Sequence, residues 1–69
     1  MPSLQQRVLS AFKAGLANEK KKVELYKGFL KSPDVDPSQK ESLKVVVRGH
    51  ENHIRVYEDL IKQATAPKA

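Results

Sequence analysis

Hydrophobic residues recur along this chain at alternating steps of three and four, the spacing that places side chains on one face of an α-helix. In the first half the stripe comprises Leu4, Val8, Phe12, Leu16, Val23, Tyr26 and Leu30, with Glu19 standing inside it. In the second half it comprises Leu43, Val46, His50, His53, Tyr57, Leu60 and Ala64, flanked by Val47, Ile54 and Ile61. The pattern predicts two amphipathic helices, and no alternating strand pattern competes with it.

Polar residues and prolines indicate where the first helix begins and ends. Ser3 and Gln6 have the spacing of a capping box, in which each side chain binds the backbone N–H of the other residue. Pro33 disfavours helical geometry at the residue before it. The first helix is therefore expected to begin at Ser3 and to stop near Lys31.

The second helix has its own start signal. Asp36 suits the N-cap, Pro37 the first helical position, and Gln39 the third. A short loop makes consecutive helices antiparallel neighbours. We therefore expect an all-α, antiparallel two-helix hairpin that forms a single domain over residues 1–69, with a helix over about 3–31, a loop over 32–36, a helix over 37–63 and a frayed tail over 64–69.

The loop position predicts which residues face each other. If the turn is centred near residue 34 or 35 and both helices rise about 1.5 Å per residue, residues whose numbers sum to about 69 are opposite. This register pairs Phe12 with Tyr57, Leu16 with His53, Val23 with Val46, and Tyr26 with Leu43. It also brings Glu19 beside His50 and His53.

The Glu19, His50 and His53 layer has two interpretations. A charge-assisted hydrogen bond between the glutamate and a histidine would specify the register of the helices. Alternatively, histidine and carboxylate ligands from facing helices would bind iron or another divalent metal, as in metal-binding helix bundles. The chain has no cysteine, which excludes disulfides and a thiolate zinc site, and no serine lies in the layer. We therefore expect no enzyme activity and no cofactor, while the metal alternative leaves metal-dependent oxidase chemistry open.

Part of this pattern resembles the first two helices of ferritin-like proteins of the bacterioferritin and rubrerythrin type. The resemblance is carried by Asn18-Glu19 with Tyr26 seven residues after the glutamate, and by His53 with Tyr57 four residues after the histidine. It implies half of a four-helix bundle in which Glu19 and His53 are metal ligands. The chain departs from the family at His50, which stands where the family has a bridging glutamate.

The remaining hydrophobic and basic residues suggest partners. The chain carries a net charge of +5 and has a pI near 9.7, and a chain of 69 residues without disulfides usually needs oligomerisation for stability. We expect a homodimeric four-helix bundle that binds and modulates, by regulation or inhibition, another protein whose identity is unknown. The residues expected to bind that partner are Leu25, Phe29, Val45, Val56, Lys21, Lys22, Arg48 and Arg55.

A basic dimer could also bind RNA or DNA through phosphate contacts, and we keep this as a second alternative. The longest unbroken hydrophobic run is Val45-Val46-Val47, and no signal peptide is visible. We therefore expect a cytoplasmic protein without a membrane partner.

Overall fold

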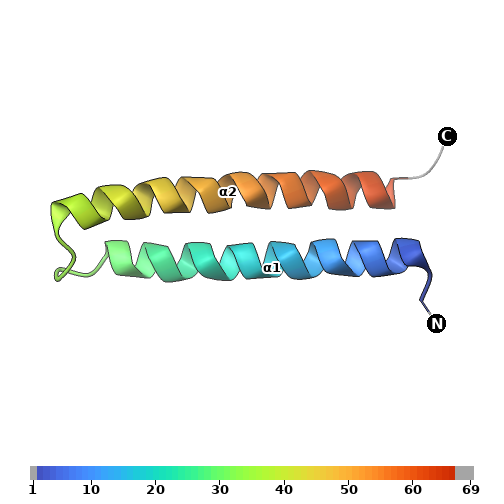
Figure 1. Ribbon diagram of the computed structural model, residues 1–69, viewed down its shortest axis with the longest axis horizontal. Coiled ribbons are helices and arrows are strands. Elements are labelled where there is room, and N and C mark those ends of the chain that lie inside the picture. Colours follow the sequence, from blue (N-terminus) through green and yellow to red (C-terminus); the bar gives the residue numbers. More distant parts are fainter. Residues whose placement is uncertain (1, 67–69) are drawn as a thin grey trace.

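The structure, a computed structural model that describes residues 2–66, consists of two antiparallel helices that pack along their whole length (Figure 1). Helix α1 spans Leu4–Leu30 and helix α2 spans Pro37–Thr65. The start of α1 and the end of α2 lie together at one end of the hairpin, and the connection 31–36 closes the other (Figure 1). The predicted all-α hairpin is confirmed.

Both predicted helix starts are capping boxes. The Ser3 hydroxyl accepts the Gln6 N–H at 3.1 Å, and the Gln6 side chain accepts the Ser3 N–H at 3.0 Å. At the second start, Asp36 Oδ1 accepts the Gln39 N–H at 2.9 Å, and the Gln39 side chain accepts the Asp36 N–H at 3.1 Å. Each box satisfies backbone donors that have no partner within the helix.

The helix ends differ slightly from the prediction. Helix α1 ends at Leu30, and the Lys31 N–H donates to the carbonyl oxygen of Gly28 at 3.2 Å. Helix α2 continues to Thr65, two residues beyond the predicted end, and the Thr65 hydroxyl donates to the Ile61 carbonyl oxygen at 2.9 Å. The predicted frayed tail therefore begins later than residue 64, and its last residues, 67–69, lie outside the described part.

The predicted register is confirmed at two levels of the hairpin. The Phe12 and Tyr57 rings pack with their centroids 6.5 Å apart, and Glu19 contacts His50. Tyr26, which the register sets against Leu43, stacks on the His50 ring, with centroids 5.6 Å apart and planes 10° from parallel. Within residues 2–66 the buried hydrophobic side chains are Val23 and Val47 alone, so the seam between the helices is narrow.

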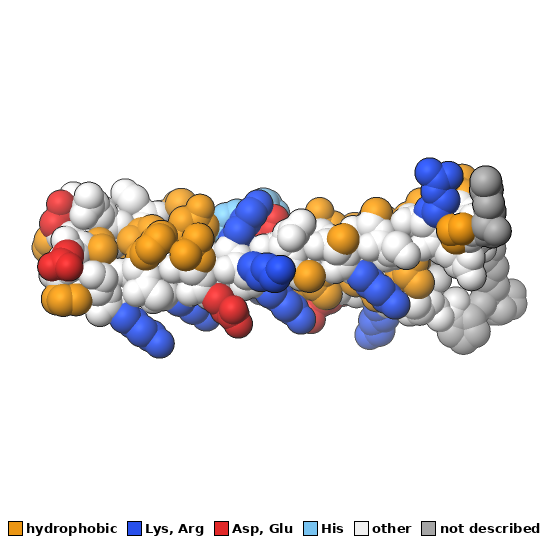
Figure 2. All heavy atoms as spheres, turned by 90° about the horizontal axis from the view of Figure 1, so that it is seen from below, with side chains coloured by type: hydrophobic (Ala, Val, Ile, Leu, Met, Phe, Trp, Pro, Cys, Tyr) orange, Lys and Arg blue, Asp and Glu red, His pale blue; other side chains and the backbone are white. Residues whose placement is uncertain are grey.

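The hairpin measures 51 × 25 × 12 Å. Its smallest dimension is the thickness of one helix, so the molecule has two broad faces. We define the histidine face by the residues that line a groove on it: Phe12, Glu19, His53, Val56, Tyr57 and Leu60. We define the lysine face by the residues that line a groove on the opposite side: Val23, Lys27, Glu51, Ile54 and Arg55. Figure 2, which looks onto α1 edge-on, shows the histidine side chains at one border of the molecule and several Lys or Arg side chains projecting from the other.

Candidate metal centre

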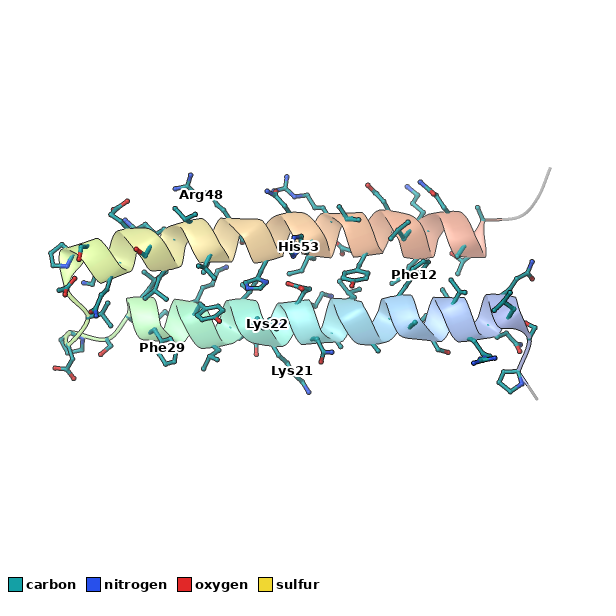
Figure 3. The ribbon with its side chains drawn as sticks, in the orientation of Figure 1. Phe12, Lys21, Lys22, Phe29, Arg48 and His53 are labelled. Carbon is teal, nitrogen blue, oxygen red and sulfur yellow. The ribbon has the colours of Figure 1, made fainter. Side chains whose placement is uncertain are left out.

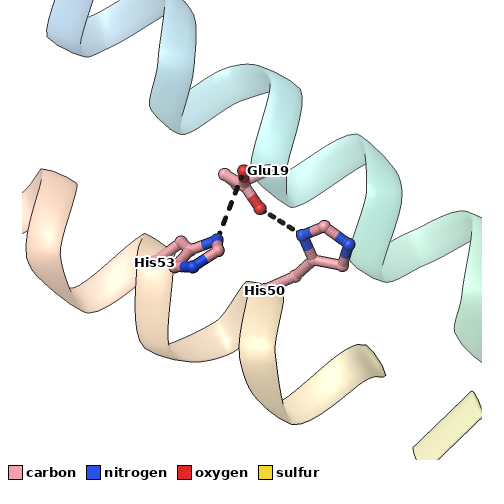
Figure 4. A group of neighbouring side chains, drawn as sticks. All are labelled: Glu19, His50 and His53. Carbon is pink, nitrogen blue, oxygen red and sulfur yellow. Dashed lines mark hydrogen bonds and ion pairs between the residues drawn. The ribbon is translucent and has the colours of Figure 1, made fainter. Parts of the chain in front are cut away.

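Glu19 of α1 lies against both histidines of α2 near the middle of the hairpin (Figure 4). His50 Nδ1 donates a hydrogen bond to Glu19 Oε2. His53 Nδ1 lies 3.6 Å from the other carboxylate oxygen, Oε1. The three side chains therefore form one cluster, as the register predicted, with the glutamate at its centre.

The helix period explains why both histidines reach the same carboxylate. Residues three apart on a helix are neighbours on its surface, so His50 and His53 present their rings to one point on α1. Their ring centroids are 5.9 Å apart, and the planes are 82° from parallel. The two rings thus approach Glu19 from different directions, as ligands around a single atom would.

Exposure differs sharply within the cluster. The side chains of Glu19 and His50 are 13% and 18% exposed, whereas that of His53 is 61% exposed. Tyr26 stacks on His50 and shields that ring. The groove beside His53, about 520 Å³ in volume, is mostly apolar, with Phe12, Tyr57 and Leu60 among its lining residues. The cluster is therefore enclosed by the helices on one side and open to the histidine face on the other.

The hydrogen bond from His50 holds the pKa of Glu19 below its usual value. Burial of the carboxylate acts in the opposite direction, and the positive charges of His50, Lys22 and His53 lower the pKa further. A hydrogen bond to the charged form of an acid favours that form. Glu19 is therefore held as a carboxylate, the form that binds a cation.

The cluster has the donors that a metal ion requires. One ligand atom from each of Glu19, His50 and His53 can be chosen so that all three lie within 4.8 Å of one another. Imidazole nitrogen and carboxylate oxygen together suit zinc, iron and neighbouring divalent metals. Glu51, the acidic neighbour of His50, lies on the lysine face instead, where its carboxylate is 3.5 Å from Lys27 Nζ.

The residues predicted to bind a partner do not form one patch. Leu25, Phe29, Val45 and Val56 are all exposed. Lys21 points away from α2 and Arg48 points away from α1, so they lie on opposite edges of the hairpin (Figure 3). Arg55 lies on the lysine face, where its guanidinium donates to Asn52 Oδ1 at 2.8 Å.

Two residues near the cluster were not assigned a role from the sequence. Tyr26 belongs to the hydrophobic stripe and to the ferritin-like resemblance, and neither predicts that it stacks on His50. Gly15, a residue of low helix propensity within α1, makes room for Tyr57: a Cβ atom at Gly15 would lie 2.5 Å from Cζ of that ring. The position of Tyr26 three residues after Val23 does not indicate that its ring contacts His50. The contact between Gly15 and Tyr57 depends on how closely the two helices approach.

Comparison of the chain with protein-family models, with curated proteins and with solved structures gives no match. Within residues 2–66, no helix is both long enough and apolar enough to span a membrane. The similarity to ferritin-like proteins thus stays a hypothesis that rests on Glu19, Tyr26, His53 and Tyr57, and the function is inferred below from the geometry of the cluster.

Proposed function

We propose that this protein binds a divalent transition-metal ion through Glu19, His50 and His53. The observation that carries the proposal is the convergence of their ligand atoms, one from each side chain, within 4.8 Å. Bonds of about 2.0–2.2 Å place ligand atoms around a tetrahedral ion roughly 3.4 Å apart. Side-chain rotations would bring the three groups to that spacing, and the His53 side chain, 61% exposed, is the least confined of the three.

Metal binding would replace the hydrogen bond between His50 and Glu19. A histidine must present an unprotonated nitrogen to a metal ion, so binding releases a proton and affinity rises with pH. Three protein ligands leave at least one coordination position for water or another ligand. The open side of the cluster faces the groove lined by Phe12, Tyr57 and Leu60, through which a further ligand would reach that position.

The proposal is tested by titrating the metal-free protein with cobalt(II), followed by visible absorption, and then displacing cobalt with zinc. The informative variant is His53→Gln, because His53 is the most exposed of the three and its replacement disturbs the helix seam least. We expect this change to weaken metal binding at least about tenfold. The control is Asn52→Gln, which puts the same side chain one position earlier on α2.

Binding that is equally strong in the wild type, His53→Gln and Asn52→Gln would show that the ion binds elsewhere, and an absence of binding would remove the proposal.

A second candidate function is the sequence-based hypothesis of a regulator that binds another protein. Leu25, Phe29, Val45 and Val56 are exposed, as that hypothesis requires, but they do not form one patch. The hypotheses of nucleic-acid binding and of a cytoplasmic location stay predictions.

A further inference from the structure

The hairpin exposes far more surface than a compact protein of its mass. Its accessible surface is 5633 Å², whereas a folded monomer of 7.8 kDa exposes about 4,400 Å². Its radius of gyration is 16.0 Å, against about 11 Å for a compact domain of 69 residues. The excess, about 1,200 Å², exceeds the roughly 800 Å² that each partner buries in a standard protein interface.

Much of the exposed hydrophobic surface gathers on the histidine face. Leu4 and Val8 line a groove at the end that carries the chain termini. Phe29 and Leu43 line another at the end that carries the connection. Val46, at 100° per residue, is turned about 100° from buried Val47, toward the side that carries His53. The face is thus hydrophobic at both ends, with the polar cluster between them.

Most basic side chains have the opposite distribution, although Lys22 of α1 is turned, like Val46 of α2, about 100° toward the histidine face. Counted at 100° per residue from Val23 on α1 and Val47 on α2, most basic residues are turned to the lysine face. Those residues are Lys13, Lys20, Lys27, Lys40, Lys44, Arg55 and Lys62. Because the chain carries a net charge of +5, two copies that met through their lysine faces would repel each other.

We propose that the histidine face is covered by a second copy of this chain, so that two hairpins form a four-helix bundle. A face 51 Å long and 25 Å wide has a projected area of about 1,300 Å², enough for a stable interface. A two-fold axis near the central cluster would lay the hydrophobic end of one copy over the opposite hydrophobic end of the other. Both lysine faces would then remain in water.

This inference depends on the distribution of hydrophobic and charged side chains and not on metal binding. It also accounts for the exposure of His53 in the single hairpin, because that side chain lies on the surface that the second copy covers. The dimer is therefore expected to form in the presence of a chelator.

The test compares two neighbouring valines, both in the presence of EDTA. Val46 is 40% exposed and turned to the histidine face, whereas Val45 is 64% exposed and lies on the outer edge of α2. We expect light scattering of the wild type to give twice the 7.8 kDa chain mass, and its melting temperature to rise with protein concentration. Val46→Lys should raise the dissociation constant of the dimer at least about tenfold, because each dimer would then bury two unpaired lysines.

The control, Val45→Lys, should stay dimeric and folded. Val46→Lys supports the proposal whether it yields a monomeric hairpin or an unfolded chain, provided that Val45→Lys keeps the wild-type mass. The proposal is overturned by a wild-type monomer whose melting is independent of concentration, by an assembly larger than two chains, or by a Val46→Lys protein that remains as dimeric as Val45→Lys. None of these results depends on whether Glu19, His50 and His53 bind a metal.

Discussion

At the scale of single residues, Gly15 decides how closely the helices approach. An added Cβ would lie 2.5 Å from Tyr57 Cζ and 2.7 Å from its hydroxyl oxygen, whereas a Cβ at Gly28 would meet nothing within 4 Å. Gly15→Ala is therefore expected to destabilise the protein by about 1–2 kcal/mol, since the displaced ring costs more than the helix propensity that alanine adds. Urea unfolding, followed by circular dichroism, measures the change.

Gly28→Ala is the matched control, and it should stabilise the protein by about 0.5–1 kcal/mol because its site is open. Equal stabilisation by both substitutions would mean that the Tyr57 ring turns aside without cost. Counted at 100° per residue, Gly15 is turned about 80° from Val23 and Gly28 about 140°, so the helical pattern places only Gly15 near α2. How closely the Tyr57 ring approaches Gly15 depends on the distance between the helix axes, which no residue pattern encodes.

The lowered pKa of Glu19 predicts how stability depends on pH. Its pKa in the folded protein lies below the ordinary value of 4.5, chiefly because His50 donates a hydrogen bond to the carboxylate. The carboxylate therefore contributes stability that is fully present above about pH 4.5 and is lost as the pH falls through the folded pKa. In the presence of a chelator, the difference in urea midpoint between wild type and Glu19→Gln should shrink as the pH falls below about 4.5.

Because Glu19→Gln removes only this carboxylate, the comparison separates its contribution to pH-dependent stability from that of other acids. Asp36 is one of those acids, and its pKa is also lowered by the hydrogen bond it accepts from Gln39. A difference that stays constant down to pH 3 would show that the Glu19 carboxylate has no favourable partner in the folded protein.

At the scale of the helices, Asp36 is the residue on which the start of α2 depends. Its carboxylate accepts the Gln39 N–H at 2.9 Å and the Ser38 hydroxyl at 2.8 Å. Asp36→Ala removes both bonds and is expected to lower the melting temperature by roughly 4–8 °C. Asp36→Asn should stay close to the wild type, because asparagine caps a helix about as well as aspartate. Thermal melting by circular dichroism measures both.

Asp34→Ala, two residues earlier, is the control. Asp34 is exposed, and its backbone N–H, which the substitution retains, donates to the Ser32 hydroxyl at 3.3 Å. A melting temperature lowered equally by Asp34→Ala and Asp36→Ala would assign the effect to loop charge and not to the cap.

The helix starts could be predicted because capping uses residues within three positions of each other, Ser3 with Gln6 and Asp36 with Gln39. The pairing of Glu19 with His50 could be predicted too, since a short connection leaves little freedom in the register of two straight helices. The end of α2 was less accessible, because no glycine or proline marks an end at residue 63 and the helix runs on to Thr65.

At the scale of the whole molecule, the sequence predicted the hairpin but not the separation of its two faces. Hydrophobic spacing identifies the side of each helix that turns toward the other, here marked by Val23 and Val47. The spacing does not show which flank of one helix lies beside which flank of the other, because that depends on the contacts between the two helices. The stacking of Tyr26 on His50 and the closeness of Gly15 to Tyr57 place these flanks on one common side.

The shortness of the connection, residues 31–36 between helices of 27 and 29 residues, has a consequence for how the chain folds. The entropy lost on closing a loop rises with its length, so contacts next to the connection are the least costly to form first. Glu19 and His50 are 31 residues apart, whereas Phe12 and Tyr57 are separated by a longer stretch of chain. The contacts between the helices are therefore expected to form first beside the connection and then progressively toward the other end of the hairpin. The contact between Glu19 and His50 should form before the contact between Phe12 and Tyr57.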